Sequence, residues 1–238
     1  MSDVVYAPAK LTRTLRITGV RADGYHLLDA EMVSIDLADE LLFSAGEGLV
    51  VVDAAPDVPR DHDNLVLKAL ALTGRAAHVQ LTKRIPSEGG LGGGSADAAA
   101  VLRWAGMTDS AIASTLGADV PFCLVGGRAR VTGVGDLIEP LPFEPRTFTL
   151  LTPPVRCPTP AVYRAWDDLG GPAGTGTNDL EPAALAVTPE LARWRDRLGD
   201  ATGQTPMLAG SGSTWFVEGD VPGDGRVVVR TLPASAHG

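Results

Sequence analysis

Residues 85–95 read IPSEGGLGGGS and are followed by an alanine-rich run from residue 96 to 104. Five of the six residues from Gly89 to Gly94 are glycine, so backbone N–H groups there can approach an anion closely. The alanine run predicts a helix, whose first turn adds further amides and the positive end of the helix dipole. We call residues 85–95 the glycine loop and predict that it binds phosphate.

Two well-known glycine motifs fit these letters poorly. A Walker A loop requires lysine after its second glycine, but Ser95 follows Gly94. A dinucleotide-binding fingerprint requires glycine three residues after Gly92, and Ser95 stands there as well, so this motif fits only if serine replaces glycine. Considered alone, the stretch also allows an ordinary glycine-rich turn between a strand and a helix.

Composition narrows the class of protein. The chain has 238 residues, enough for one large domain or two modest ones, and 45% hydrophobic residues can form a packed core. A formal charge of -9 without a dense basic run argues against nucleic acid or an anionic membrane as a partner. Cys123 and Cys157 lack metal-ligand spacing. The absence of a signal-like or membrane-spanning run predicts a cytoplasmic protein.

Hydrophobic periodicity predicts strands and helices in mixed order. Lys10 and Thr12 should point the same way from a strand over residues 4–17. A proline-rich segment at 139–146 marks a boundary, which predicts domains 1–145 and 146–238. Other expected strands cover 33–37, 41–43, 49–52, 79–85, 148–151 and 226–232, and expected helices cover 65–73, 96–104, a short stretch before Gly117, and segments opened by Thr159-Pro160 and Thr188-Pro189.

Several polar residues have both a chemical and an ordinary interpretation. Lys10 fits a solvated strand face as well as a catalytic site. The Asp-Gly turn before Tyr25 and His26 delivers an aromatic ring and an imidazole together, which can bind a planar ring or simply cover the core and face water. Asp119 lies two residues before Pro121, a pattern that predicts a helix N-cap.

Three ordered motifs resemble those of the GHMP kinase superfamily: PAK at 8–10, the glycine loop, and GSGS at 210–213. Within it, RADGYH at 21–26, LGGGSADAAA at 91–100, LGADVPF at 116–122 and NDL at 178–180 resemble the kinases of 4-diphosphocytidyl-2-C-methyl-D-erythritol. This resemblance implies an α+β, two-domain fold, with a domain like domain 2 of ribosomal protein S5 followed by a ferredoxin-like domain. It also implies ATP-dependent phosphorylation of the substrate's 2-hydroxyl, in the non-mevalonate isoprenoid pathway, with Mg²⁺.

The resemblance implies roles for individual residues. Asp119 would take the hydroxyl proton and Lys10 would stabilise the charges, which suits a reaction that depends on positioning and electrostatics. His26 would contact the edge of the cytosine, and Tyr25 and Tyr163 its faces. The residues implied to bind ATP are Asn64, Pro86, Gly89, Gly90, Leu91, Gly92, Gly93, Gly94 and Ser95, with Ser95 also near Mg²⁺. Thr12, Gly210, Ser211 and Gly212 complete the implied substrate site.

Two features depart from the family pattern. Thr12 replaces an asparagine of the family and keeps only a hydroxyl on that face, and Arg13 replaces an apolar residue. The segment from Trp104 to Leu116 is shorter than in the family. Two alternatives therefore stay open: a GHMP kinase of another small alcohol, and a nucleotide-binding regulator that has lost catalysis.

Overall fold

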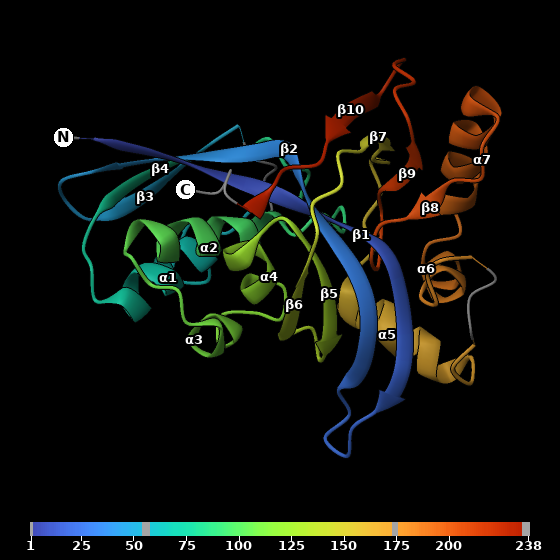
Figure 1. Cartoon of the computed structure of the whole chain (residues 1–238), viewed down its shortest axis with the longest axis horizontal. Helices are drawn as coiled ribbons and strands as arrows, with labels where there is room; N and C mark the ends of the chain where they lie inside the picture. The colour runs from blue at the N-terminus through green and yellow to red at the C-terminus, as the bar shows by residue number, and fades with distance from the viewer. Residues whose placement is uncertain (1, 54–57, 173–175, 235–238) are drawn as a thin grey trace.

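Two β-sheets flanked by helices make up the computed structural model, which describes residues 2–53, 58–172 and 176–234 (Figure 1). The first sheet runs in the order β3-β4-β2-β5-β6, with β1 paired to β2 beside this path, and only β3 and β4 are parallel. Its strands are β1 (Asp3–Val20), β2 (His26–Ser44), β3 (Gly48–Val52), β4 (His78–Thr82), β5 (Arg128–Gly133) and β6 (Leu137–Leu141).

The alanine run forms the central helix of the first half. Helix α2 (Gly93–Trp104) buries every residue from Ala96 to Leu102, and its small side chains allow close packing against neighbouring elements. It begins three residues before the expected position, because Gly92 (φ 70°) ends the loop there. The neighbouring helices are α1 (Leu65–Thr73), α3 (Ser110–Ser114) and α4 (Val120–Val125).

The second sheet has the ferredoxin-like strand order. Its strands are β7 (Thr147–Leu151), β8 (Met207–Leu208), β9 (Trp215–Glu218) and β10 (Arg226–Arg230), in the antiparallel order β10-β7-β9-β8. Helices α5 (Thr159–Asp168), α6 (Glu181–Val187) and α7 (Leu191–Thr202) connect β7 to β8. A loop at 219–225 connects β9 to β10, so the second crossover helix of a ferredoxin-like domain is absent from this described segment. The expectation of an α+β fold is confirmed. Helix α6 was not expected from the sequence.

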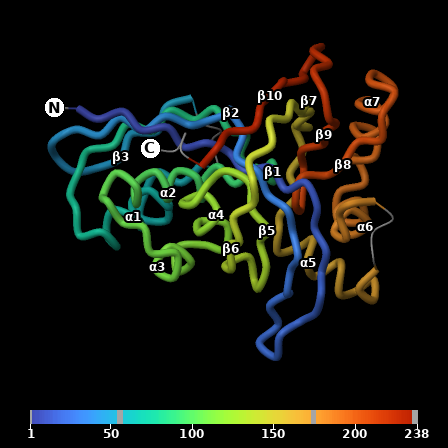
Figure 2. The backbone as a smooth tube through the Cα atoms, viewed as in Figure 1, coloured from blue at the N-terminus to red at the C-terminus, as the bar shows by residue number. Residues whose placement is uncertain are grey.

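Strands β1 and β2 extend from the first sheet into the second half of the molecule (Figure 2). Leu15 forms a parallel bridge to Asn178 and packs in a core with Val162 and Leu180. Ile35 in turn bridges to Thr231. The first 35 residues therefore contribute to both halves of the fold.

The proline-rich segment 139–146 is only partly a linker. Pro140 lies in β6, an edge strand, where the missing N–H of proline interrupts no internal ladder. Only residues 142–146 lie between β6 and β7. A domain boundary at 145/146 stays a prediction. Within the described residues, no helix combines the length and apolar character needed to cross a membrane.

Candidate active site

A cleft of about 1390 Å³ lies where the glycine loop, the middle of β1, the first part of β2, helix α5 and the loop 209–214 meet. We call residues 209–214 the second loop. Leu91 and Gly212 do not line the cleft, because Leu91 is buried in the core and Gly212 packs against Cys157. The candidate residues that do line it are Lys10, Thr12, Tyr25, His26, Asn64, Pro86, Gly89, Gly90, Gly92, Gly93, Gly94, Ser95, Asp119, Tyr163, Gly210 and Ser211.

Lys10 lies at an irregular point of β1, where the register with β2 shifts between Pro8 and Lys10. Its backbone N donates to the carbonyl of Leu91 at 3.0 Å, which attaches the glycine loop to this strand. The side chain passes directly over Gly92: a Cβ placed there would lie 2.8 Å from Lys10 Cγ. Glycine is therefore required at 92 both for its positive φ and for this contact.

Asp119 occupies the N-cap position of α4 that its sequence context predicts, but its side chain does not cap the helix. Its Oδ2 instead lies 3.4 Å from Lys10 Nζ, and Lys10 donates to Thr12 Oγ1 at 3.1 Å. The Lys10 side chain is 7% exposed and that of Asp119 33%, so a nearly buried ammonium faces a carboxylate open to the cleft. Lys10 and Thr12 share one face, as expected.

The second loop closes directly against the glycine loop. A Cβ placed at Gly90 (φ 75°) would lie 2.2 Å from the carbonyl oxygen of Ala209 and 2.8 Å from that of Gly212. A Cβ at Gly210 would lie 3.4 Å from Lys10 Nζ. The three motifs at 8–10, 85–95 and 210–213, far apart in sequence, thus meet around one ammonium group.

The start of α2 offers amides to an anion. Gly92, the N-cap, has no side chain to bond the first-turn amides, and no described side chain caps this end. Gly93, Gly94 and Ser95 line the cleft at this point. A 12-residue helix that opens without a side-chain cap into a cleft is suited to hold phosphate oxygens.

A buried charge cluster beneath the glycine loop was not anticipated. Lys83 Nζ lies 2.7 Å from Asp97 Oδ2 and also pairs with Asp39. Asp39 accepts hydrogen bonds from the backbone N of Arg84 and of Ile85, where β4 leads into the loop. The cluster therefore joins β2, the start of the glycine loop and α2. A lone aspartate inside the alanine run was the signal that could have revealed it.

The cluster has a distinctive charge balance. Burial raises the pKa of Asp97 to about 8 despite the opposing charge of Lys83, and the carboxylate of Asp39 adds to the rise. Burial works against the Lys83 ammonium, but Asp97 and Asp39 outweigh it and raise the pKa of Lys83. Oδ1 of Asp97 is buried without a hydrogen-bond partner. One positive charge is thus shared by two acidic side chains, and burial favours the protonated form of Asp97.

The other end of the cleft is aromatic. The ring centroids of His26 and Tyr163 are 4.8 Å apart, and Trp166 packs edge-on at 5.4 Å from His26. Tyr25 is 63% exposed beside them, and burial raises the pKa of Tyr163. His26 Nε2 lies 2.8 Å from Asp167 Oδ1. The structure thus adds Trp166 and Asp167, on the same helix as Tyr163, to the residues expected here.

Asn64 lines the cleft, but its side chain already forms hydrogen bonds with the backbone. Its Oδ1 accepts from the backbone N of Val66 at 2.9 Å, as the N-cap of α1, and its Nδ2 donates to the carbonyl of Pro59 at 2.7 Å. A direct contact of Asn64 with the nucleotide stays a prediction, and its observed role is to fix the start of α1.

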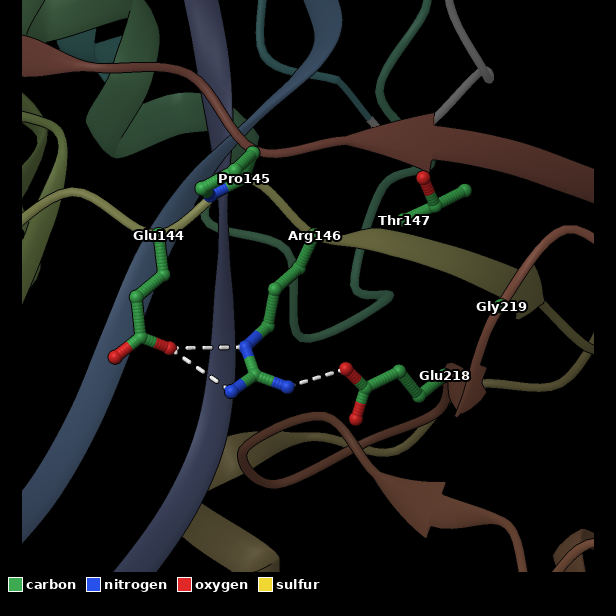
Figure 3. A pocket seen from close by; sticks show the side chains of 6 residues that line it. All are labelled: Glu144, Pro145, Arg146, Thr147, Glu218 and Gly219. Carbon is green, nitrogen blue, oxygen red and sulfur yellow. Dashed lines mark hydrogen bonds and ion pairs between the residues drawn. The ribbon is translucent and has the colours of Figure 1, made fainter.

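A second, smaller hollow of about 480 Å³ lies at the start of β7 (Figure 3). Arg146 occupies it, with its Nε and Nη2 donating to Glu144 Oε2 at 3.0 and 2.9 Å and its Nη1 paired with Glu218. Two carboxylates hold this one guanidinium, so the residues lining the hollow offer no unpaired cation to a phosphate. The larger cleft is therefore the candidate active site.

Comparisons with known proteins identify the class of protein. The family model "GHMP kinases N terminal domain" matches residues 64–127. A solved structure titled 4-(cytidine 5'-diphospho)-2C-methyl-D-erythritol kinase is 31% identical, with a TM-score of 0.75 over 97% of this chain and 99% of that chain. A mevalonate kinase structure, 12% identical with a TM-score of 0.59 over 97% of this chain and 99% of that chain, shares the fold. The fold is that of a GHMP kinase.

Curated relatives define the family more narrowly. The 4-diphosphocytidyl-2-C-methyl-D-erythritol kinase of Ruegeria pomeroyi is 39% identical over 100% of this chain and 96% of its own length. That of Thiobacillus denitrificans is 36% identical over 100% of this chain and 94% of its own length. The chain belongs to the 4-diphosphocytidyl-2-C-methyl-D-erythritol kinase family. The Ruegeria alignment spans 272 positions, more than this chain contains, so that relative carries residues that the chain lacks.

Proposed function

We propose that this chain transfers the γ-phosphoryl group of ATP to the 2-hydroxyl of 4-diphosphocytidyl-2-C-methyl-D-erythritol, in the cytoplasm. The observation that carries the proposal is the position of the Lys10–Asp119 pair, which lies in one cleft with the glycine loop and with the aromatic residues around His26. A phosphate-binding end, a proton acceptor and a ring-binding end in one cleft match a nucleotide donor and a cytidylated alcohol acceptor.

Each group of the cleft has a role in the transfer. Asp119, open to the cleft, accepts the proton of the substrate hydroxyl, whose oxygen forms a bond to the γ-phosphorus as the bond to the bridging oxygen of ADP breaks. Lys10 Nζ, fixed by Thr12 and close to Asp119, stabilises negative charge on the attacking oxygen and the transferred group. The amides at the start of α2 hold phosphate oxygens in line.

Thr12 supports Lys10 in this proposal. Its hydroxyl accepts a hydrogen bond from Lys10 Nζ and is 1% exposed as a residue, so it can orient the ammonium. The hydrogen bond from Lys10 therefore gives the Thr12 hydroxyl a role at the position where the family has asparagine. Catalysis is compatible with the departure at Thr12, which favours the kinase over an inactive regulator.

Magnesium fits the cleft as an ion that arrives with ATP. The described residues contain no group of three or more His, Cys, Asp or Glu side chains placed to hold a metal. Mg²⁺ keeps several waters and binds nucleotide phosphates with few protein ligands, so the hydroxyl of Ser95, at the start of α2, would suffice as one ligand. Bound there, the ion would neutralise phosphate charge.

Release of ADP in the presence of ATP and Mg²⁺ tests the proposal. We expect release with 4-diphosphocytidyl-2-C-methyl-D-erythritol and none with 2-C-methyl-D-erythritol 4-phosphate, its uncytidylated counterpart. Equal release with both would favour a kinase of another small alcohol. ATP binding without release for either would favour a regulator that has lost catalysis.

The variant Asp119→Asn tests the proton acceptor. It keeps the size of the side chain but cannot accept the proton, so we expect turnover to fall about 10²-fold or more. Because Asp119 is not among the groups proposed to hold ATP, the dissociation constant for ATP, measured by calorimetry, should stay within about threefold. Undiminished turnover would leave Asp119 with no role in the chemistry.

A further inference from the structure

His26 and Asp167 form a pair that the transfer reaction itself does not require. His26 Nε2, at the start of β2, lies 2.8 Å from Asp167 Oδ1, on α5. The His26 side chain is 9% exposed and that of Asp167 48%, so the imidazole lies largely under the aromatic residues while the carboxylate is at the surface. Nδ1 of His26 has no hydrogen-bond partner among the residues that the structure describes, and His26 lines the cleft.

This geometry fixes the tautomer of a neutral His26. An ionised carboxylate only accepts hydrogen bonds, so the nitrogen that faces Asp167 must carry the proton. The other nitrogen, Nδ1, then presents a lone pair and can only accept. Tyr163 and Trp166, which contact the imidazole, hold its plane in place. Asp167 thus decides which type of hydrogen-bonding group His26 offers to the cleft.

An acceptor at this position distinguishes two pyrimidines of nearly equal shape. Cytosine carries an amino donor at its 4-position, whereas uracil carries a carbonyl acceptor there. As an acceptor, Nδ1 can form a hydrogen bond with the amino group of cytosine. Toward uracil, its lone pair would face the lone pairs of the carbonyl oxygen and repel them. A buried polar group left unpaired costs more than the bond itself contributes, which is why such sites discriminate strongly.

We propose that Asp167 is a specificity-determining positioning residue, which holds His26 in the tautomer that accepts from the 4-amino group of cytosine and rejects uracil. This inference rests on the proposed function, because it assumes that the cytosine of the substrate occupies the aromatic end of the cleft. It extends that function by assigning the choice of base to a residue that does not itself touch the base.

Asp167→Asn tests the proposal, with Asp168→Asn as the matched control. Asp168 is the next residue of α5, carries the same charge and is exposed. An asparagine at 167 can either accept from Nε2 or donate to it, so both tautomers become available. We expect the ratio of kcat/KM for the cytidylated alcohol over its uridylated analogue to fall about tenfold or more, the scale of one hydrogen bond. The control should keep the native ratio, and the KM for ATP should change in neither variant.

Two further measurements separate positioning from general structural damage. Two-bond ¹H–¹⁵N correlation spectra at pH 8 should show the His26 proton on Nε2 in the native protein and a mixture of tautomers in Asp167→Asn. In a His26→Ala background, Asp167→Asn should leave the base ratio unchanged, because its effect passes through the imidazole. A native tautomer in Asp167→Asn, or an undiminished effect without His26, would overturn the proposal.

A binding assay keeps this inference distinct from the proposed function. Calorimetric titration with CMP and with UMP requires no phosphoryl transfer. If the native chain failed to phosphorylate the cytidylated alcohol but bound CMP more tightly than UMP, with the preference lost in Asp167→Asn, the proposed function would fail and this inference would stand. If the chain phosphorylated the alcohol and Asp167→Asn kept the native base ratio, the opposite would hold.

Discussion

Replacement of Lys83 by methionine should destabilise the protein strongly, because it removes the only cation of a buried cluster. The side chains of Lys83, Asp39 and Asp97 are 7%, 0% and 4% exposed. Removing one partner of such a buried pair typically costs about 3–5 kcal/mol, since the remaining charge stays desolvated. Against a total stability of about 5–15 kcal/mol, this is roughly a fifth of the whole or more. Methionine is also unbranched and lacks only the terminal atom of the lysine side chain, so the loss reports mainly the charge.

The size of the loss should depend on pH. The pKa of Asp97 is raised in the folded state, so its contribution to stability is fully present below its unfolded pKa of 3.8 and is lost as pH rises towards about 8. Without Lys83 no positive charge stabilises the ionised form of Asp97. In the variant, folding therefore requires Asp97 to stay protonated up to a higher pH. The deficit of Lys83→Met relative to the native protein should therefore be larger at pH 8 than at pH 5.

Urea unfolding at pH 5, 6.5 and 8 measures this deficit. Lys68→Met is the matched control, because Lys68 pairs with Asp63 at 3.5 Å on the surface, where such pairs contribute about 0–1 kcal/mol. The double variant Lys83→Met/Asp97→Asn removes one of the uncompensated acids and should regain part of the loss. Deficits for Lys83→Met and Lys68→Met that agree within about 1 kcal/mol at every pH would refute this reasoning.

Two smaller changes probe the support of Lys10. Gly92→Ala should lower kcat about tenfold or more, because the new Cβ would meet Lys10 Cγ at 2.8 Å. Gly106→Ala is its control: φ is also positive, at 77°, but nothing lies within 4 Å, so it should cost only the stability of a strained backbone, and equal kcat values for the two variants would contradict the prediction. Thr12→Val removes the acceptor of the Lys10 hydrogen bond at nearly constant volume, and should lower kcat several-fold with little change in the KM for ATP. A change confined to the KM for the alcohol would instead assign Thr12 to substrate contact.

Local patterns predicted much of this architecture correctly. The expected helix over 65–73 has those bounds, with Gly74 at its end, because capping and periodicity are properties of neighbouring residues. Lys10 and Thr12 lie on one face for the same reason. Asp119 does occupy the predicted N-cap position of α4, but its side chain makes no capping bond. Local patterns missed this because the ammonium beside its carboxylate comes from a strand more than a hundred residues earlier.

Pairs between distant segments were beyond the reach of sequence patterns. Lys83 follows β4 and meets Asp39 on the neighbouring strand β2, and His26 meets Asp167 on α5, with nothing in the spacing of either pair to connect them. The resemblance to a family predicted which motifs meet in the cleft. It did not predict what holds them there, since that support comes from buried pairs that only the folded chain assembles.

The sharing of β1 and β2 between the two halves has a consequence for synthesis on the ribosome. Leu15 packs against residues of the second half, and the backbone N of Leu232 donates to the carbonyl of Ser34 at 2.8 Å. At ribosomal rates of about 5–20 residues per second, roughly 200 residues and 10–40 seconds separate Ser34 from its partner. For that time the nascent chain carries two long strands whose apolar side chains, such as Leu15 and Ile35, lack part of their final cover. We expect it to depend on chaperones until its last strand emerges.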